Sequence, residues 1–267
     1  MSGREPRVPP AQNTIVVVGG GCYGSYYVRQ LRRAAAAGGL RAERILVVDR
    51  DPACMVATQV DASSALRVDV VVREWADFFD EYLTAAVDSP ATFGRDAIVP
   101  SPLMPHLMGE WLVTRARRRY GGRVSMLPLD AIPPVPWERA GADGTHYASF
   151  ATWMCPVNCI EPRTCPHTRG ARTWSMPETI MRHSAERSEA SRQVLSAVMF
   201  CRHRTFGVGM FDTAEVVDAD ARIAGAAGRN AVDVIIGTVS HCHGALTRLH
   251  IDAAPIPARA TAGSRLG

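Results

Sequence analysis

The chain is 267 residues long, 47% of them hydrophobic, and has a net charge of +4 at pH 7. That length and composition allow one large domain or two modest ones, each with a buried core. All 30 basic residues are arginines, because the sequence contains no lysine. The composition therefore excludes Schiff-base enzymes, pyridoxal phosphate enzymes that use an internal lysine, and Walker-type phosphate loops.

The sequence has no pattern typical of a membrane or nucleic-acid protein. Residues 1–10 are polar and proline-rich, so we expect neither a signal peptide nor an anchor there. No run approaches the roughly 18 consecutive apolar residues of a transmembrane helix. The positive charge is modest and mixed with acidic residues. We therefore expect a soluble, cytoplasmic protein with no membrane partner and no nucleic-acid partner.

A glycine-rich turn stands between a predicted strand and a predicted helix near the start of the sequence. Residues 14–18 form an apolar, mostly β-branched run, and a helical pattern continues to about Ala37. Between them, Gly19, Gly21 and Gly24 have the G-x-G-x-x-G spacing. In a dinucleotide site the first glycine permits the tight turn, and the second lets the backbone approach a pyrophosphate. The third lets the helix pack close to the strand, with its N-terminus facing the anion.

A second predicted strand, residues 45–48, ends in Asp49, at about the distance where an acidic residue usually meets the ribose hydroxyls. Strand, turn, helix, strand and acid together predict a bound nucleotide. The alternative is that the glycines end the strand for packing reasons and that Asp49 is a solvated turn residue. The predicted cofactor-binding residues are Gly19, Gly20, Gly21, Cys22, Tyr23, Gly24, Asp49 and Arg50.

The stretch from residue 14 to residue 49 resembles the NAD(P)-binding Rossmann superfamily through Gly19, Gly21, Gly24 and Asp49. The resemblance implies a Rossmann-like doubly wound parallel sheet with NAD or NADP as its cofactor. Asp49 favours NAD, because a carboxylate repels a 2′-phosphate, while the neighbouring Arg50 leaves NADP open. The resemblance covers less than half of the chain, and the same fold serves both enzymes and ligand sensors.

Strand and helix patterns alternate through the rest of the first half. The predicted strands are 66–72, 96–99 and 123–127, and the predicted helices are 75–87 and 107–119. The loop 101–106 follows a strand, so we expect it over the nucleotide. His106 in this loop is either an active-site group or a helix-entry residue without a catalytic role. Four prolines between 128 and 136 mark a boundary between a dinucleotide-binding domain, 12–130, and a second domain, 131–267.

The second half again combines strands with helices. Strands are predicted at 145–151, 194–200 and 231–239, and helices at 177–185 and 213–227, with a long loop from 155 to 174. We therefore expect an α/β fold in which the Rossmann-like sheet is followed by a smaller α/β domain with a cysteine-rich metal-binding loop.

That loop contains Cys155, Cys159, Cys165 and His167 in the pattern C-x3-C-x5-C-x-H. Thiols this close together in a cytosolic protein favour metal binding or redox chemistry over structural disulfides. Three thiolates and one imidazole would fill a tetrahedral zinc site or hold an iron–sulfur cluster. We favour the iron–sulfur cluster and keep zinc as the alternative, since the C-x2-C pairing usual for structural zinc is absent.

Two other places offer further metal ligands. Cys201 follows one predicted strand, and His241, Cys242 and His243 follow another. If these strands are parallel neighbours, both groups emerge at the same edge of the sheet and could converge with the cysteine loop. The predicted metal ligands are Cys155, Cys159, Cys165, Cys242, Cys201 and His167. Cys201 could equally be a buried thiol that packs as a small apolar residue.

The leading hypothesis for function is an NAD(P)-dependent oxidoreductase with an iron–sulfur or zinc site beside the nucleotide. His243 or His241 would transfer the proton, because imidazole titrates near neutral pH. A small-molecule substrate follows from this hypothesis, and a homodimer is left open. The alternative is a nucleotide-sensing regulatory or binding module, in which the cysteine loop is a structural metal site.

Overall fold

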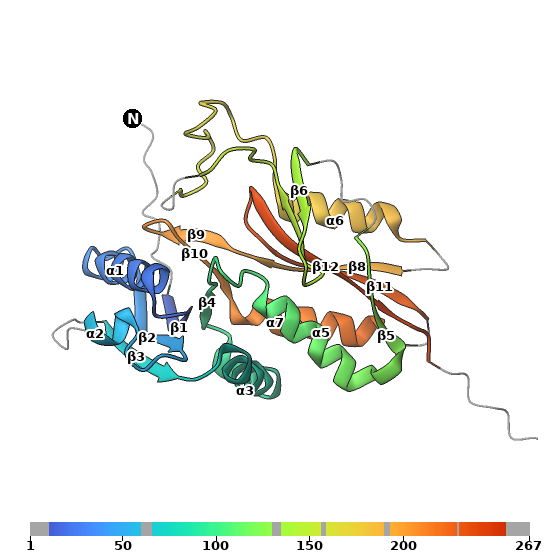
Figure 1. Cartoon of the computed structure of the whole chain (residues 1–267), viewed down its shortest axis with the longest axis horizontal. Helices are drawn as coiled ribbons and strands as arrows, with labels where there is room; N and C mark the ends of the chain where they lie inside the picture. The colour runs from blue at the N-terminus through green and yellow to red at the C-terminus, as the bar shows by residue number, and fades with distance from the viewer. Residues whose placement is uncertain are drawn as a thin grey trace, which may run out of the picture.

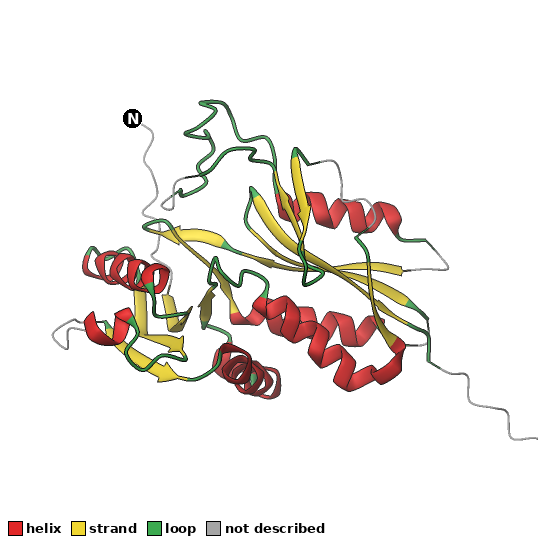
Figure 2. Ribbon diagram, viewed as in Figure 1, coloured by secondary structure: helices red, strands yellow, loops and turns green. Residues whose placement is uncertain are grey.

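The computed structural model describes residues 11–59, 66–129, 135–155, 159–189, 193–228 and 230–254. Over these residues the fold is mixed α/β and contains two mixed β-sheets (Figure 1, Figure 2). Residues 1–10, and most of the proline-rich boundary predicted at 128–136, lie outside the described residues. In the described part of the chain, no helix combines the length and the apolar character needed to cross a membrane.

The first sheet begins with four parallel strands in the order β3-β2-β1-β4. They are β1 (Ala11–Val18), β2 (Arg41–Asp49), β3 (Arg67–Val72) and β4 (Ala97–Val99). Two further strands, β10 (Val208–Asp212) and β9 (Arg202–Thr205), continue the sheet antiparallel beyond β4. The first sheet is therefore mixed, which corrects the expected purely parallel sheet. A hairpin from the second half of the chain covers the edge that β4 would otherwise expose.

Helices cover both faces of this sheet. Alternate residues of a strand point to opposite faces. Ile15 and Val17 of β1 therefore pack in one core with α1 (Cys22–Ala36) and α2 (Met55–Gln59), whereas Val16 and Val18 pack in another with α3 (Trp75–Asp88). A short helix, α4 (Pro90–Phe93), connects α3 to β4. This arrangement places the N-terminus of α1 at the carboxyl end of β1, directly after the glycine turn.

The second sheet has the strand order β6-β7-β12-β11-β8, and β5 also pairs with β12. Its strands are β5 (Val124–Leu127), β6 (Trp137–Ala140), β7 (His146–Ser149), β8 (Gln193–Phe200), β11 (Val232–Val239) and β12 (His243–Ile251). β8 and β11 are parallel neighbours. This confirms the condition under which Cys201 and residues 241–243 emerge at the same edge of the sheet. β5 belongs to this sheet and not, as we expected, to the first one, because its backbone pairs with β12 at the far end of the chain.

Three longer helices cover the second sheet on its two faces (Figure 1). α6 (Met176–Arg187) packs Met176 and Ile180 on one face. The described residues between β7 and α6 form a loop that contains one isolated bridge, between Thr164 and Ala171 (Figure 2). α5 (Leu107–Tyr120) and α7 (Thr213–Ala226) pack on the other face, and the 3-10 turn 121–123 leads from α5 into β5. One core cluster contains Leu83 of α3, Phe211 of β10 and Ile236 of β11, so the two sheets share a hydrophobic core.

Candidate functional site

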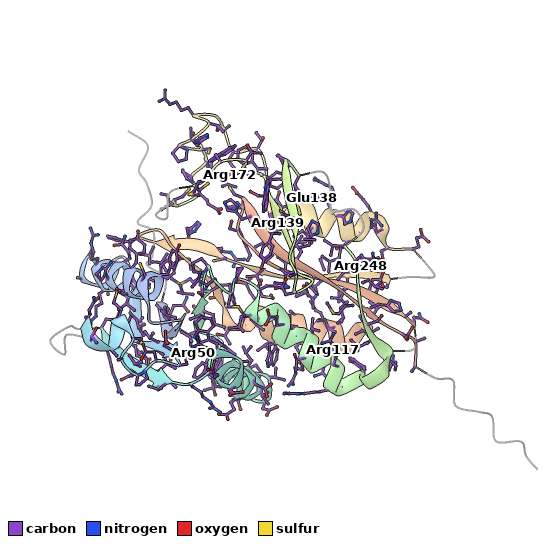
Figure 3. The ribbon with its side chains drawn as sticks, in the orientation of Figure 1. Arg50, Arg117, Glu138, Arg139, Arg172 and Arg248 are labelled. Atoms are coloured by element: carbon purple, nitrogen blue, oxygen red, sulfur yellow. The ribbon has the colours of Figure 1, made fainter. Side chains whose placement is uncertain are left out.

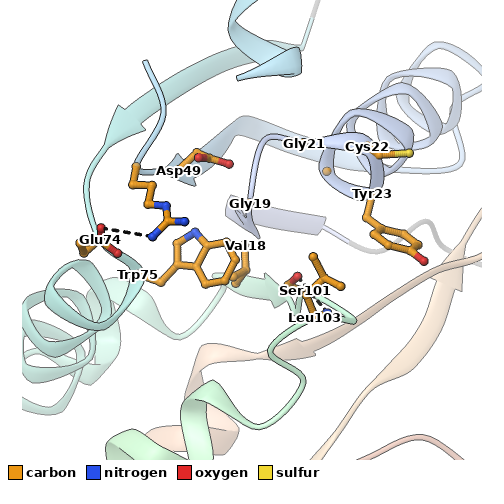
Figure 4. Close-up of a pocket in the computed structure, with 12 residues that line it drawn as sticks. Val18, Gly19, Gly21, Cys22, Tyr23, Asp49, Glu74, Trp75, Ser101 and Leu103 are labelled. Atoms are coloured by element: carbon orange, nitrogen blue, oxygen red, sulfur yellow. Dashed lines mark hydrogen bonds and ion pairs between the residues drawn. The ribbon is translucent and has the colours of Figure 1, made fainter. Parts of the chain in front are cut away.

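A cavity of about 450 Å³ lies where the glycine turn enters α1, and we call it the turn cavity (Figure 4). Every residue predicted to bind the cofactor lines it, except Gly20. The lining residues are Val18, Gly19, Gly21, Cys22, Tyr23, Gly24, Asp49, Arg50, Glu74, Trp75, Ser101 and Leu103. The structure thus brings the predicted residues together in one concave site.

The three glycines of the motif have different physical roles. Gly19 has a φ of 87°, a left-handed conformation that strains other residues. A Cβ on Gly24 would lie 1.8 Å from the carbonyl oxygen of Gly19, so only glycine lets α1 pack this close to the turn. A Cβ on Gly21, by contrast, would meet no atom within 4 Å. Gly21 therefore faces open space in the cavity, where a ligand could approach the backbone.

The carboxylate of Asp49 is bound to the backbone around it. Its Oδ2 accepts a hydrogen bond from the Gly20 N–H at 2.6 Å, and its Oδ1 accepts one from the Asp51 N–H at 2.9 Å. Asp49 therefore fixes the end of β2 against the glycine turn. Since an ionised carboxylate can accept about four hydrogen bonds, acceptor positions remain for ribose hydroxyls.

Glu74 and Trp75 line the turn cavity together with Asp49 (Figure 4), and Arg50 also lines it. The guanidinium of Arg50 lies 4.0 Å from the carboxylate of Glu74, and both side chains are largely exposed. The indole N–H of Trp75 donates to the carbonyl oxygen of Val48 at 2.9 Å, which holds the ring across the carboxyl end of the sheet. A flat aromatic surface and a cation therefore flank the cavity. Figure 3 shows that Arg50 and the other labelled arginines come from different segments of the chain.

The loop that follows β4 contributes to two cavities. Ser101 and Leu103 line the turn cavity, while Pro100 and Pro105 line a second cavity. This second cavity, which we call the sheet cavity, measures about 320 Å³. Its lining residues are Pro100, Pro105, Trp137, Tyr147, Ala148, Ser149, Cys201, Thr238, Val239, Ser240, His243, Gly244 and Ala245. Part of this loop therefore lies in the wall of the turn cavity, and its placement over a nucleotide stays a prediction.

His106 fixes this loop to the second sheet. Its Nδ1 lies 3.2 Å from the hydroxyl oxygen of Thr238 on β11, and its Nε2 is buried without a hydrogen-bond partner among the described residues. Burial lowers the pKa of His106 to about 4, so the ring is neutral at pH 7. Because its side chain is buried and lines neither cavity, we assign His106 a structural role.

The structure separates the two histidines that we predicted to be catalytic. His243 lines the sheet cavity, and its Nδ1 lies 2.9 Å from the hydroxyl oxygen of Ser149. Partial burial lowers the pKa of His243, and the nearby Glu161 carboxylate opposes that shift. His241 lies edge-on to the ring of Phe200 and lines neither cavity. Of the two, only His243 can meet a ligand in a described cavity.

Glu161 is a buried group that the sequence did not single out. Its backbone has a φ of 47°, and its carboxylate accepts hydrogen bonds from the Ser240 hydroxyl at 2.6 Å, the His241 N–H at 2.9 Å and the Cys242 N–H at 3.2 Å. Burial alone would raise the pKa of Glu161, but these hydrogen bonds outweigh it and hold the pKa below the usual value. Glu161 thus ties the cysteine loop to the turn between β11 and β12. A lone glutamate in an irregular loop gives no periodic signal, and only the fold reveals its partners.

The cysteines of the predicted metal site have free thiols and lie in the loop and on the adjacent turn. Burial raises the pKa of Cys155, and the neighbouring Cys159 and Cys165 thiols raise it further. Cys242 accepts a hydrogen bond at Sγ from the indole N–H of Trp174 at 3.2 Å. Burial raises the pKa of Cys242 to about 12, so its thiol is protonated at neutral pH.

The other two predicted ligands, His167 and Cys201, make different contacts. His167 stacks on the ring of Trp153, with 4.6 Å between ring centroids. Cys201 lines the sheet cavity, and burial raises its pKa to about 12. Within the ranges that the structure describes, no three His, Cys, Asp or Glu side chains are placed to hold one metal ion. The iron–sulfur or zinc site stays a prediction, and we derive no chemistry from it.

Comparison with known proteins adds one relationship. The family model described as "Uncharacterized protein, C-terminal domain" matches residues 108–252, from α5 through β12. No curated protein and no solved structure matches the chain. The matched span includes the β9–β10 hairpin and the strands of the second sheet, and the glycine turn lies outside it.

Proposed function

We propose that this chain, which belongs to the family of that C-terminal domain through residues 108–252, is an NAD(P)-dependent oxidoreductase that binds its dinucleotide in the turn cavity. One observation carries the proposal: the glycine turn, the N-terminus of α1 and Asp49 at the end of β2 line a single cavity. The parallel strand order β3-β2-β1-β4 supports a Rossmann-like origin for this part of the fold.

The residues present fit a dinucleotide. The open space at Gly21 admits a diphosphate to the backbone, and the first N–H groups of α1 cannot be satisfied within the helix. The positive end of the helix dipole favours an anion at the same place. Asp49 has acceptor positions for ribose hydroxyls, and the exposed Arg50 can reach a 2′-phosphate. Trp75 offers an aromatic surface to a purine ring.

A bound nicotinamide would supply the hydride chemistry, and the protein would supply its binding and the proton transfer. Of the histidines predicted for proton transfer, we retain His243, because it lines a cavity next to the loop that walls the nucleotide site. We no longer assign this role to His241, whose ring packs on Phe200.

Calorimetric titration with NAD, NADP and ADP tests the proposal. Gly21→Val should weaken dinucleotide binding by at least about tenfold, because a side chain there would occupy the space next to the turn without clashing with the fold. Gly122→Val is the matched control, since a Cβ at Gly122 also meets nothing within 4 Å. Gly122 lies far from the glycine turn in sequence and lines neither cavity.

Three results would contradict the proposal. They are no binding of NAD or NADP to the wild type, equal binding to Gly21→Val, and equal loss in Gly122→Val. An absorbance assay for NAD(P)H with a panel of substrates then separates the two functional classes. Dinucleotide binding without turnover, and with ADP bound as tightly, would favour a nucleotide-sensing module instead.

A further inference from the structure

The sheet cavity differs in chemistry from the turn cavity. None of its described lining residues carries a formal charge at neutral pH, whereas Arg50, Asp49 and Glu74 line the turn cavity. Its walls are mostly apolar, with the aromatic rings of Trp137 and Tyr147 among them. An anionic ligand would lose its hydration there without gaining a cation, so the cavity disfavours carboxylates and phosphates. Its volume of about 320 Å³ is within the range of small-molecule sites.

A few polar groups meet at one end of this cavity. Ser149 donates its hydroxyl hydrogen to the carbonyl oxygen of Ala151 at 2.8 Å. Since that hydrogen is its only one, the 2.9 Å contact between Ser149 Oγ and His243 Nδ1 requires Nδ1–H to be the donor. In this tautomer the Nε2 of His243 carries a lone pair. Nε2 makes no hydrogen bond to the described residues, so it remains available to a ligand.

The position of the sheet cavity connects it to the proposed nucleotide site. The short loop after β4 gives Ser101 and Leu103 to one cavity and Pro100 and Pro105 to the other. His106 and Thr238 hold that loop against β11, on the same face of the second sheet as the cavity. A dinucleotide whose diphosphate lies at the glycine turn has its other half directed past this loop.

We infer that the sheet cavity is the substrate site, for a small, neutral and largely apolar molecule with one hydroxyl group, which donates a hydrogen bond to Nε2 of His243. The inference rests on the proposed function and adds the substrate class to it. With a nicotinamide dinucleotide bound, Nε2 would accept the proton of the substrate hydroxyl, and the oxidised nicotinamide would accept the hydride from the carbon that bears it. A carbonyl product, a reduced dinucleotide and one proton result, so atoms and electrons balance.

A pair of probes with the same ring tests the substrate class. Benzyl alcohol is neutral and has one hydroxyl group, whereas benzoate is an anion of similar size. Saturation-transfer NMR on the full chain without nucleotide should show saturable binding of benzyl alcohol and at least about tenfold weaker binding of benzoate. Equal or tighter binding of benzoate would overturn the inference, as would no binding of benzyl alcohol.

Two variants locate the binding. Trp137 is 44% exposed, so Trp137→Ala should leave the fold intact while it weakens benzyl alcohol binding several-fold. Met181→Ala is the matched control, because Met181 is an exposed apolar residue on α6, across the second sheet from the cavity. Unchanged binding in Trp137→Ala, or equal loss in both variants, would place the probe elsewhere and overturn the inference.

The role of Ser149 as a positioning residue has its own spectroscopic readout. In ¹⁵N-labelled protein at neutral pH, His243 should be protonated at Nδ1, and Ser149→Ala should shift the ring toward the Nε2–H tautomer. An Nε2–H tautomer in the wild type would overturn the assignment of Nε2 as the proton acceptor. None of these measurements needs a bound nucleotide. A failure of dinucleotide binding is therefore seen separately, in the calorimetric titrations.

Discussion

Glu161 shows how one buried charge can organise an irregular loop. Its carboxylate, 6% exposed, is bound by groups of three successive residues in the turn between β11 and β12. Hydrogen bonds to a charged acceptor are stronger than those between neutral groups. They offset the strain of its left-handed backbone and the loss of hydration. The same turn leads into His243. Glu161 therefore also helps to fix the position of this proposed proton acceptor.

We predict that Glu161→Gln lowers the free energy of unfolding at pH 7 by about 1–3 kcal/mol, because the amide replaces one acceptor oxygen with a donor that faces N–H groups. The folded pKa of Glu161 is held below its usual value of 4.5. The stabilisation is therefore complete above about pH 4.5 and is lost as the pH falls through the folded pKa.

Urea unfolding of wild type and variant at several pH values measures this effect. The difference between them should be constant from pH 7 to about pH 5 and should shrink in more acidic buffer. Glu178→Gln is the control, because Glu178 is an exposed residue on α6 and its loss should change stability by less than about 0.5 kcal/mol. A difference between wild type and Glu161→Gln that grows toward low pH would contradict this account.

The start of α5 depends on the packing of one histidine against one glycine. A Cβ on Gly109 would lie 2.3 Å from Cε1 of His106, so the glycine makes room for the buried ring. That ring connects the loop after β4 to Thr238 on β11. The position of this loop therefore depends on the contact between α5 and the second sheet. Because residues of the loop line both cavities, the same contact affects both.

We predict opposite effects of two glycine-to-alanine substitutions in helices. Gly109→Ala should destabilise the protein by about 1–3 kcal/mol, since His106 must leave its position near Thr238. Gly225→Ala in α7 should stabilise it by up to about 1 kcal/mol, because a Cβ there meets nothing within 4 Å and alanine favours the helix. Thermal unfolding of both variants measures the two signs. Stabilisation by Gly109→Ala would show that His106 does not need this space.

Elements with strong local patterns could be predicted from the sequence, and those defined by distant partners could not. The apolar run of β1, the helical spacing of α3 and the boundaries of β11 all agree with expectation. β9 has an exposed or partly exposed Arg-His-Arg run and only four residues, so it has no apolar alternation to detect. It is a strand because β10 pairs with it, and β10 in turn pairs with β4 from the other half of the chain.

The candidate site divides in the same way. The glycine spacing and the acid after β2 were visible in the sequence, because local backbone geometry requires them. The sheet cavity was not, since Trp137, Ser149 and His243 meet only through the pairing of β6, β7 and β12. For the sheet cavity, the sequence supported only the conditional expectation that β8 and β11 are neighbours.

The two sheets are joined by more than a linker. One core cluster contains Phe79 and Leu83 of α3 together with Ile223 of α7 and Val234 of β11. The chain also passes from the second sheet into the first through β8, β9 and β10. Between α5 and α7, the buried carboxylate of Asp220 pairs with Arg115 at 2.9 Å. A core shared in this way favours one cooperative unit across the boundary predicted between residues 130 and 131.

We therefore predict a single unfolding transition for the whole chain. Leu83→Ala removes a fully buried side chain of α3 and should cost about 2–5 kcal/mol. Ile223→Ala, in α7, should cost a similar amount. Each variant should shift the entire transition, followed both by far-UV circular dichroism and by tryptophan fluorescence, because both side chains belong to the shared core. If Leu83→Ala shifted only the first of two separable transitions and Ile223→Ala only the second, the halves would fold independently, and the boundary predicted from the prolines would mark two true domains.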